Sequence, residues 1–352
     1  MRRTALSTIL ASLFLLCIAS GAAWQLTSTT PQKMSTCASK WLGQLKPDQI
    51  AKAQLEYGAP NRVDWHFIPK DSRKGLQVRD MTPEQRKAAD KLLANCLSAA
   101  GYKKVSTIMD LEIFLKTVQT KKKETTPLRD HERYYFTVFG KPSTKGKWGL
   151  SIEGHHMSLN FVVEGEKLLS ATPLALCSNP AVVMTSYPEA PKTPKGTRVL
   201  AGEEQLAFDL VNSLSDEQKK KAIIAEKAPA ELREAAQPQP KVEAPAGIVD
   251  GDLNEKQKSM LAQLVAVYVQ NLPEDVAIAR MGEIGGGGEN SIHFAWAGAL
   301  KPGVGHYYRI QGKTFLIEFV NVQPDAEGNL ANHVHCVLRH LDGDFGIELE
   351  KK

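Results

Sequence analysis

The chain carries little net charge for its length. Its 44 lysines and arginines against 39 aspartates and glutamates give a formal charge of +5 over 352 residues. These charges are scattered along the sequence, and loss of Arg2 and Arg3 with the signal described below lowers the net charge by two. Nucleic-acid binding requires a basic patch or stripe, so we predict no nucleic-acid partner.

Several signatures of familiar chemistry are missing. There is no Gly-x-Ser-x-Gly elbow, so serine-nucleophile chemistry has no support. The glycine run 285–288 lacks a following Lys-Ser/Thr or helix, which predicts a flexible loop and not a phosphate cradle. The segment 333–335 matches the start of a cupin motif, but Arg339 and His340 stand where a glutamate is expected, and too few residues follow for the second motif.

The N-terminus has the features of an export signal. Arg2 and Arg3 precede an apolar run, Ala5–Ala19, which is followed by small residues that suit cleavage. We predict a signal peptide at residues 1–23 and an exported protein, periplasmic or extracellular. The alternative is an uncleaved membrane anchor, but the run is short for a bilayer span. We therefore expect no stable membrane span after cleavage.

Cysteine is scarce, and one of the five, Cys17, lies inside the predicted signal. Cys37–Cys96 is the first disulfide to test, because it would staple the N-terminal segment to a helix. Cys336 lies beside His335 and is a candidate metal ligand, although a buried free thiol is the commoner explanation. Three pairings are open to the four cysteines that remain after cleavage: Cys37, Cys96, Cys177 and Cys336.

Helix-start signals recur along the chain. Thr82, Ser215 and Asn254 each lie three positions before a glutamine, the spacing of a capping box. Apolar residues at helical spacing follow the first and third of these starts and predict helices there. Gly101 is predicted to end the first of them, and a further helix is expected over 106–118.

The strand-forming segments occur in two blocks of similar sequence. Phe136–Val163 aligns without a gap to Phe294–Asn321, and each block has the pattern of a β-hairpin or meander. Helical patterns precede both blocks, which favours an internal duplication. The identical pairs are Phe136/Phe294, Gly140/Gly298, Ile152/Ile310, Gly154/Gly312 and Phe161/Phe319.

We therefore predict an α+β fold with two pseudo-repeated helix-plus-antiparallel-β halves packed as one domain. The predicted domain spans 37–349, with halves at about 37–185 and 200–349 whose strand blocks meet at a central cleft. The stretch 226–247, rich in proline and alanine, is predicted to be an extended connection or a surface arm.

The histidines suggest where function resides. His333 and His335 are spaced i, i+2 in a strand-like segment, so their side chains share one face. With His306 and His156 they form the predicted ligand set for zinc, iron or copper. The open alternative is that these imidazoles complete a polar network in the core.

Three charged residues are the catalytic candidates. Glu318 is a carboxylate in an apolar strand, so it needs a metal, a histidine or an arginine beside it. We predict that it serves as a metal ligand or general base, with Arg309 or Arg339 as an electrostatic clamp. The leading hypothesis is metal-dependent hydrolysis of an unidentified small-molecule or oligomeric substrate.

A second hypothesis uses the aromatic residues instead of a metal. Core packing explains these side chains equally well. They would line a cleft for a sugar or another organic ligand, as in a metal-free binding module. The residues are Trp148, Trp296, Tyr307 and Tyr308, with Arg309 and Gln311.

Several motifs resemble a family known as domain of unknown function 3500. The resemblance runs from about Trp65 to Gly346 and implies one family domain. It brings no established activity and no validated catalytic residues. The motifs are Trp65-His66-Phe67-Ile68-Pro69, Arg73-Lys74-Gly75-Leu76, Tyr134-Tyr135-Phe136, the segment from Gly154-His155-His156 to Phe161, His306-Tyr307-Tyr308-Arg309-Ile310 and Asn332-His333-Val334-His335.

Overall fold

A computed structural model describes residues 28–124 and 129–349. The predicted signal peptide lies outside these residues. Within them the chain forms eight α-helices and one 13-stranded sheet. None of the helices in these two ranges is long and apolar enough to span a membrane.

The helices are α2 (Thr30–Leu42), α3 (Pro47–Ala53), α4 (Pro83–Cys96), α5 (Ala99–Lys121), α6 (Ala201–Ser213), α7 (Asp216–Ala222), α8 (Glu255–Val269) and α9 (Glu274–Gly285). The strands of the first half are β1 (Gln54–Leu55), β2 (Leu76–Gln77), β3 (Tyr135–Phe139), β4 (Lys147–Gly154), β5 (Met157–Glu164), β6 (Lys167–Ser170) and β7 (Leu174–Leu176). Those of the second half are β8 (Ile223–Ala225), β9 (Ile248–Val249), β10 (His293–Gly298), β11 (His306–Gln311), β12 (Phe315–Gln323) and β13 (His333–His340).

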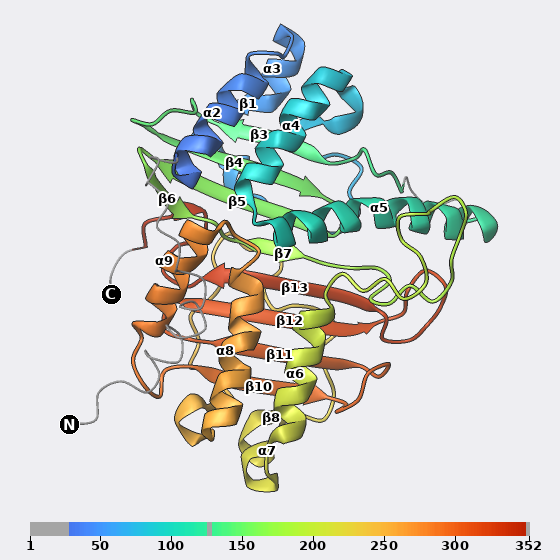
Figure 1. The fold of residues 1–352 in the computed structure, drawn as a ribbon, viewed down its shortest axis with the longest axis vertical. Coiled ribbons are helices and arrows are strands. Elements are labelled where there is room, and N and C mark those ends of the chain that lie inside the picture. The colour runs from blue at the N-terminus through green and yellow to red at the C-terminus, as the bar shows by residue number, and fades with distance from the viewer. Residues whose placement is uncertain (1–27, 125–128, 350–352) are drawn as a thin grey trace, which may run out of the picture.

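The strands run in the order β1-β3-β4-β5-β7-β13-β12-β11-β10-β8, with β2, β6 and β9 paired to β3, β5 and β10. The β1–β3 and β8–β10 pairs are parallel, so the fold is a mixed α/β domain and not purely antiparallel in its strands. The two strand blocks do not meet across a central cleft. They join edge to edge, because β7 pairs with β5 on one side and β13 on the other (Figure 1).

The longer helices cover one face of this sheet (Figure 1). Because side chains alternate along a strand, Val334, Cys336 and Leu338 of β13 enter the core under the helices, whereas Val337 joins an apolar cluster on the other face. The stretch 226–247 covers part of that second face and buries Leu232 there. This stretch was predicted as an extended connection or surface arm; it has no helix or strand, and it packs against the sheet through Leu232.

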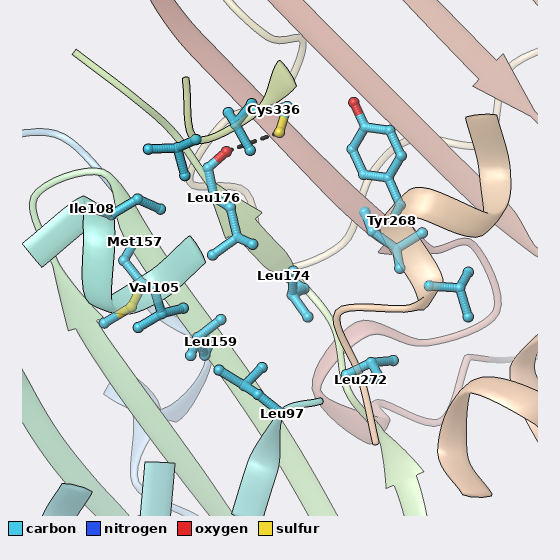
Figure 2. Close-up of a cluster of buried hydrophobic side chains, with 14 of the residues drawn as sticks. Leu97, Val105, Ile108, Met157, Leu159, Leu174, Leu176, Tyr268, Leu272 and Cys336 are labelled. Atoms are coloured by element: carbon cyan, nitrogen blue, oxygen red, sulfur yellow. Dashed lines mark hydrogen bonds between the residues drawn. The ribbon is translucent and has the colours of Figure 1, made fainter. Parts of the chain in front are cut away.

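The two halves share one apolar core around β7. Figure 2 shows side chains from both halves meeting there, each at most 4% exposed. Burial of this continuous apolar surface couples the halves thermodynamically. The labelled residues are Leu97, Val105, Ile108, Met157, Leu159, Leu174, Leu176, Tyr268, Leu272 and Cys336.

The three predicted capping boxes begin α4, α7 and α8. The side chains of Thr82, Ser215 and Asn254 each accept a hydrogen bond from the backbone N–H of the glutamine three positions later. Each glutamine in turn accepts one from the backbone N–H of its capping residue. Two otherwise unpaired backbone donors are thereby satisfied at each helix start.

Gly101 does not end a helix, contrary to the prediction. Helix α4 stops at Cys96, and Ser98 then caps α5, so Gly101 lies in the first turn of the new helix. The Ser98 N–H donates to the carbonyl oxygen of Asn271 at 2.9 Å, which brings the start of α5 against the chain after α8. A methyl group at position 101 would overlap this backbone carbonyl.

We expect Gly101→Ala to destabilise the protein by about 1–3 kcal/mol, because the overlap forces backbone shifts that exceed the gain in helix propensity. Urea denaturation provides the measurement. The matched control is Gly282→Ala in α9, where a methyl group meets nothing within 4 Å. It should stabilise by about 0.5–1 kcal/mol. Equal effects of the two substitutions would contradict the close-packing explanation.

Candidate metal centre

Three histidines from two distant parts of the chain meet beside β7. His333 and His335 project from one face of β13, as their spacing predicts, and His156 lies in the tight turn between β4 and β5. The Nε2 atom of His333 is 2.9 Å from Nε2 of His156 and 3.1 Å from Nε2 of His335. We call these residues the three-histidine cluster.

The backbone of His156 is held in an uncommon conformation. Its φ of 64° lies in the left-handed region, which costs an L-residue about 1–2 kcal/mol. Two hydrogen bonds fix it there, from the His156 N–H to Phe67 O at 2.7 Å and from the Cys177 N–H to His156 O at 2.8 Å. Such strain persists where the surroundings enforce it, and it is frequent at functional sites.

Polar groups outside the cluster orient its imidazoles. Glu231 Oε2 lies 2.7 Å from Nδ1 of His335. When neutral, His335 therefore donates its Nδ1 proton to this carboxylate and leaves the Nε2 lone pair directed at the cluster. A carboxylate on the far nitrogen is the usual outer partner of a metal-bound histidine. Asn179 Nδ2 lies 3.3 Å from Nδ1 of His333, and as an amide donor it places the proton of neutral His333 on Nε2, where a metal ion has to displace it.

A fourth imidazole, His155, stacks against the cluster. Its ring centroid is 3.6 Å from that of His156. Its Nδ1 lies 2.5 Å from Glu112 Oε1, and Arg129 Nη1 lies 2.7 Å from Nδ1 and 3.0 Å from Nε2. When the neutral ring donates its Nδ1 proton to the carboxylate, Nε2 is the nitrogen left to accept from the guanidinium. Both nitrogens of His155 are therefore engaged outside the cluster.

Burial favours the neutral forms of His155, His156 and His333. It lowers the pKa of His333 to about 2, and the neighbouring His335 and His155 act in the same direction. The pKa of His156 falls well below 6.5 through burial and the nearby histidines, His155 first. Burial also lowers the pKa of His155, although Glu112 opposes this. Neutral imidazole is the form that binds metals.

Two groups of buried or half-buried side chains could hold a metal ion. They are His156 with His333 and His335, and Glu112 with His155 and His156, and within each group the ligand atoms lie within 4.8 Å of one another. Tetrahedral zinc, with Zn–N of about 2.0–2.1 Å, places its ligand atoms about 3.4 Å apart. The separations of 2.9 and 3.1 Å in the three-histidine cluster are close to this value. Since His155 is engaged elsewhere, the three-histidine cluster fits better.

His306 does not join this cluster. It lies on the helix-facing side of β11, with its ring 4.6 Å from that of Phe208 and its Nε2 3.3 Å from Glu204 Oε1. The i, i+2 rule could not show this, because it relates residues within one strand only. The face of β11 that carries His306 was set by the sheet register.

Glu318 pairs with an arginine and lies apart from the three-histidine cluster. Its Oε1 accepts hydrogen bonds from Arg233 Nε at 2.9 Å and from the Tyr307 hydroxyl at 2.5 Å. Arg309 lies directly opposite Glu318 on the neighbouring strand. All three charged candidates lie on the face that carries His335, but none contacts the cluster among the described residues.

The guanidinium of Arg339 is used in contacts that hold the fold together. Its guanidinium pairs with the buried carboxylate of Asp344, donates to Gln237 O at 2.8 Å and lies over the Trp65 ring at 5.0 Å. Such a fully engaged cation anchors the loop after β13 to the second face of the sheet.

Cys336 points away from the histidines beside it. Its thiol donates to Leu176 O at 2.8 Å, on the helix side of the sheet (Figure 2). Burial raises its pKa, which keeps the thiol protonated. All four cysteines in the described part of the chain are free, Cys37 and Cys96 included.

The aromatic residues proposed to line a cleft are core residues. Trp148, Trp296, Tyr307 and Tyr308 are at most 2% exposed. The Trp296 and Tyr308 rings stack at 6.3 Å, and the Tyr308 hydroxyl is 2.5 Å from that of Tyr268. This packing leaves no open face on these rings for a ligand.

The sequence did not single out three residues around the cluster as site residues: Glu112, Arg129 and Glu231. A signal existed for Glu112, because it falls on the apolar stripe of its helix, four residues after Ile108 and three before Leu115. Glu231 had no such signal, since its stretch was predicted as an extended connection or surface arm. Its position depends on how that stretch packs on the sheet.

A family model described as "Protein of unknown function (DUF3500)" matches residues 27–347, nearly the whole chain. The chain belongs to the DUF3500 family. The resemblance found in the sequence is thereby confirmed, and the match extends further toward the N-terminus than the motifs did. No curated protein and no solved structure is similar enough to this DUF3500 chain to match it.

We expect the metal-free protein to lose stability as the pH falls below about 6.5. The unfolded chain then binds protons at His156 and His333, whose folded-state pKa values are lowered, so acid favours unfolding. Urea denaturation with a chelator at about pH 7.5 and about pH 5.5 measures this. The loss should be smaller in His333→Gln, because glutamine cannot titrate. An unchanged loss in this variant would show that other groups control it.

Proposed function

We propose that this is an exported metal-dependent enzyme that hydrolyses its substrate, with His156, His333 and His335 as the metal ligands. The observation that carries the proposal is the convergence of three Nε2 atoms in the three-histidine cluster, one of them backed by Glu231. Three protein ligands leave one position of a tetrahedral ion open, as catalytic zinc sites do. The signal-like N-terminus supports the export part of the proposal.

Zinc is the ion that this donor set favours. Three neutral imidazoles suit zinc, copper and iron, and the nearby thiol that would favour a softer site, Cys336, points to the other face. Such an ion supplies Lewis acidity and lowers the pKa of water to about 7. The chain itself orients the ligands through Glu231 and excludes water by burying the imidazoles.

His155 is the residue that we propose as proton acceptor, in place of Glu318. Glu112 holds its Nδ1 proton, so its Nε2 carries a lone pair, from which Arg129 has to withdraw before it accepts a proton. This is the arrangement by which a buried carboxylate orients a histidine base. His155 also lines a cavity, described below, whereas Glu318 is occupied by Arg233 and Tyr307.

We also propose that the two halves arose by duplication. Supporting this, Phe136 pairs with Ile152 in the first half as Phe294 pairs with Ile310 in the second. The order α2-α3-β1-β2-α4 recurs as α6-α7-β8-β9-α8. The turn that carries His156 has a counterpart without histidine between β11 and β12, at Gly312, so divergence between the halves produces a single asymmetric site.

Purified protein should bind one zinc ion per chain, measured by elemental analysis and by calorimetric titration after chelation. His333→Ala and His335→Ala should each weaken binding at least 100-fold, because each removes one of three protein ligands. The matched control is His340→Ala, on the same strand but against Glu283 on the helix face. Its affinity should be unchanged. Wild-type protein without stoichiometric metal would refute the proposal.

The metal-loaded protein should hydrolyse a member of a panel of nitrophenyl carboxylate and phosphate esters, and chelation should abolish this activity. His155→Gln should lower kcat about 100-fold or more with metal content unchanged, the size expected for loss of a general base. His131→Gln, at a half-exposed imidazole, is the control. If His155→Gln keeps full kcat, His155 is not the proton acceptor.

A further inference from the structure

A cavity of about 510 Å³ adjoins the histidines on the first-half side of the site. Glu112 and His155 form part of its wall, and Tyr135 of β3 forms another part. Because the ring of His155 stacks on that of His156, a molecule bound in this cavity lies one side chain away from the three-histidine cluster. The cavity is therefore the natural place for a substrate.

The cavity wall carries an excess of uncompensated positive charge. Lys70, Arg129 and Arg133 line it, and none has a carboxylate partner among the described residues. Arg133 donates to the carbonyl oxygens of Lys70 and Asp71, at 2.9 and 2.8 Å, and Arg129 to His155. These contacts orient the guanidinium groups without neutralising them.

The acidic residues of the wall compensate only part of this charge. Asp130 pairs with Arg79, but the partner of Glu112 is the imidazole of His155 and not a lysine or arginine. Asp71 has no side-chain partner in the described ranges. Three cations without a carboxylate partner therefore face two carboxylates, Asp71 and Glu112, without a lysine or arginine partner.

Two buried donors also lack partners at this cavity. The Tyr135 hydroxyl belongs to a residue that is 3% exposed, and it has no hydrogen-bond partner in the described part of the chain. The buried Nε of Arg129 has none either. A buried donor without a partner costs about 1–3 kcal/mol, so these two groups are best explained by a ligand that accepts from them.

We propose that this cavity binds an oxyanion group, carboxylate or phosphate, of the substrate, through Arg129, Arg133 and the Tyr135 hydroxyl. Planar guanidinium groups match the oxygens of both anions, and a phenol hydroxyl donates to either. The inference rests on the proposed hydrolytic function for the role of the bound molecule, but anion binding itself does not require the metal.

Calorimetric titration of the full chain with inorganic phosphate and with malonate, at low ionic strength and with a chelator present, tests this. We expect at least one of the two to bind, and the tighter of them identifies the oxyanion class. Arg129→Met and Arg133→Met should each weaken binding about tenfold or more, the effect of one hydrogen bond to a charged group. Tyr135→Phe, which keeps the ring in place, should weaken it less but measurably.

The control is Lys220→Met in α7, a side chain 70% exposed at the other end of the sheet. It removes one positive charge far from the cavity and should leave binding unchanged. Failure of both anions to bind at millimolar concentration overturns the inference, as does equal weakening by Lys220→Met.

A second comparison separates this inference from the proposed function. His333→Ala should lose zinc and keep anion binding. If the wild type binds zinc but neither anion, the proposed oxyanion pocket is refuted and the proposed metal site is retained. If it binds an anion but no stoichiometric zinc, the proposed metal site is refuted and the pocket is retained.

Discussion

The hydrogen-bond ladder of β7 is the constraint on which the rest of the structure depends. This strand is only three residues long, yet it pairs with β5 and with β13 and so makes one sheet from two blocks. Just beyond it, Cys177 donates to His156 O, and Ser178 exchanges two backbone hydrogen bonds with Val334. The same short stretch therefore ties the His156 turn to the start of β13. Without this pairing, no backbone contact would hold His156 of the first half beside His333 and His335 of the second.

The second constraint is the cost of burying charge on the face of the sheet opposite the helices. There the structure satisfies most charged side chains with a specific partner, as for Glu318 with Arg233 and Arg339 with Asp344. Among the described residues, Arg309 Nε on this face also lacks a partner, as do Arg129 Nε and the Tyr135 hydroxyl. The last two belong to residues that line the cavity, which is why we assign them to a ligand.

The proposed site is asymmetric, although the chain carries two strand blocks of similar sequence. The turn between β4 and β5 carries His155 and His156, whereas its counterpart between β11 and β12 packs Phe315 against Gly312. The stretch 226–247 crosses the second face and supplies Glu231 to His335. Strand β13 thus contributes His333 and His335, the turn contributes His155 and His156, and the crossing segment contributes Glu231, so none of them forms the proposed site alone.

Much of the local structure followed from the sequence. Capping boxes begin α4, α7 and α8, and the i, i+2 spacing placed His333 and His335 on one face, because both depend on residues a few positions apart. The family was also identified from the motifs alone. Only the tertiary structure decided that His156 joins these histidines and His306 does not, that Glu318 takes Arg233, and that Gly101 begins a helix against Asn271. Each of these depends on sheet register or on contacts between distant segments, which the local sequence pattern does not encode.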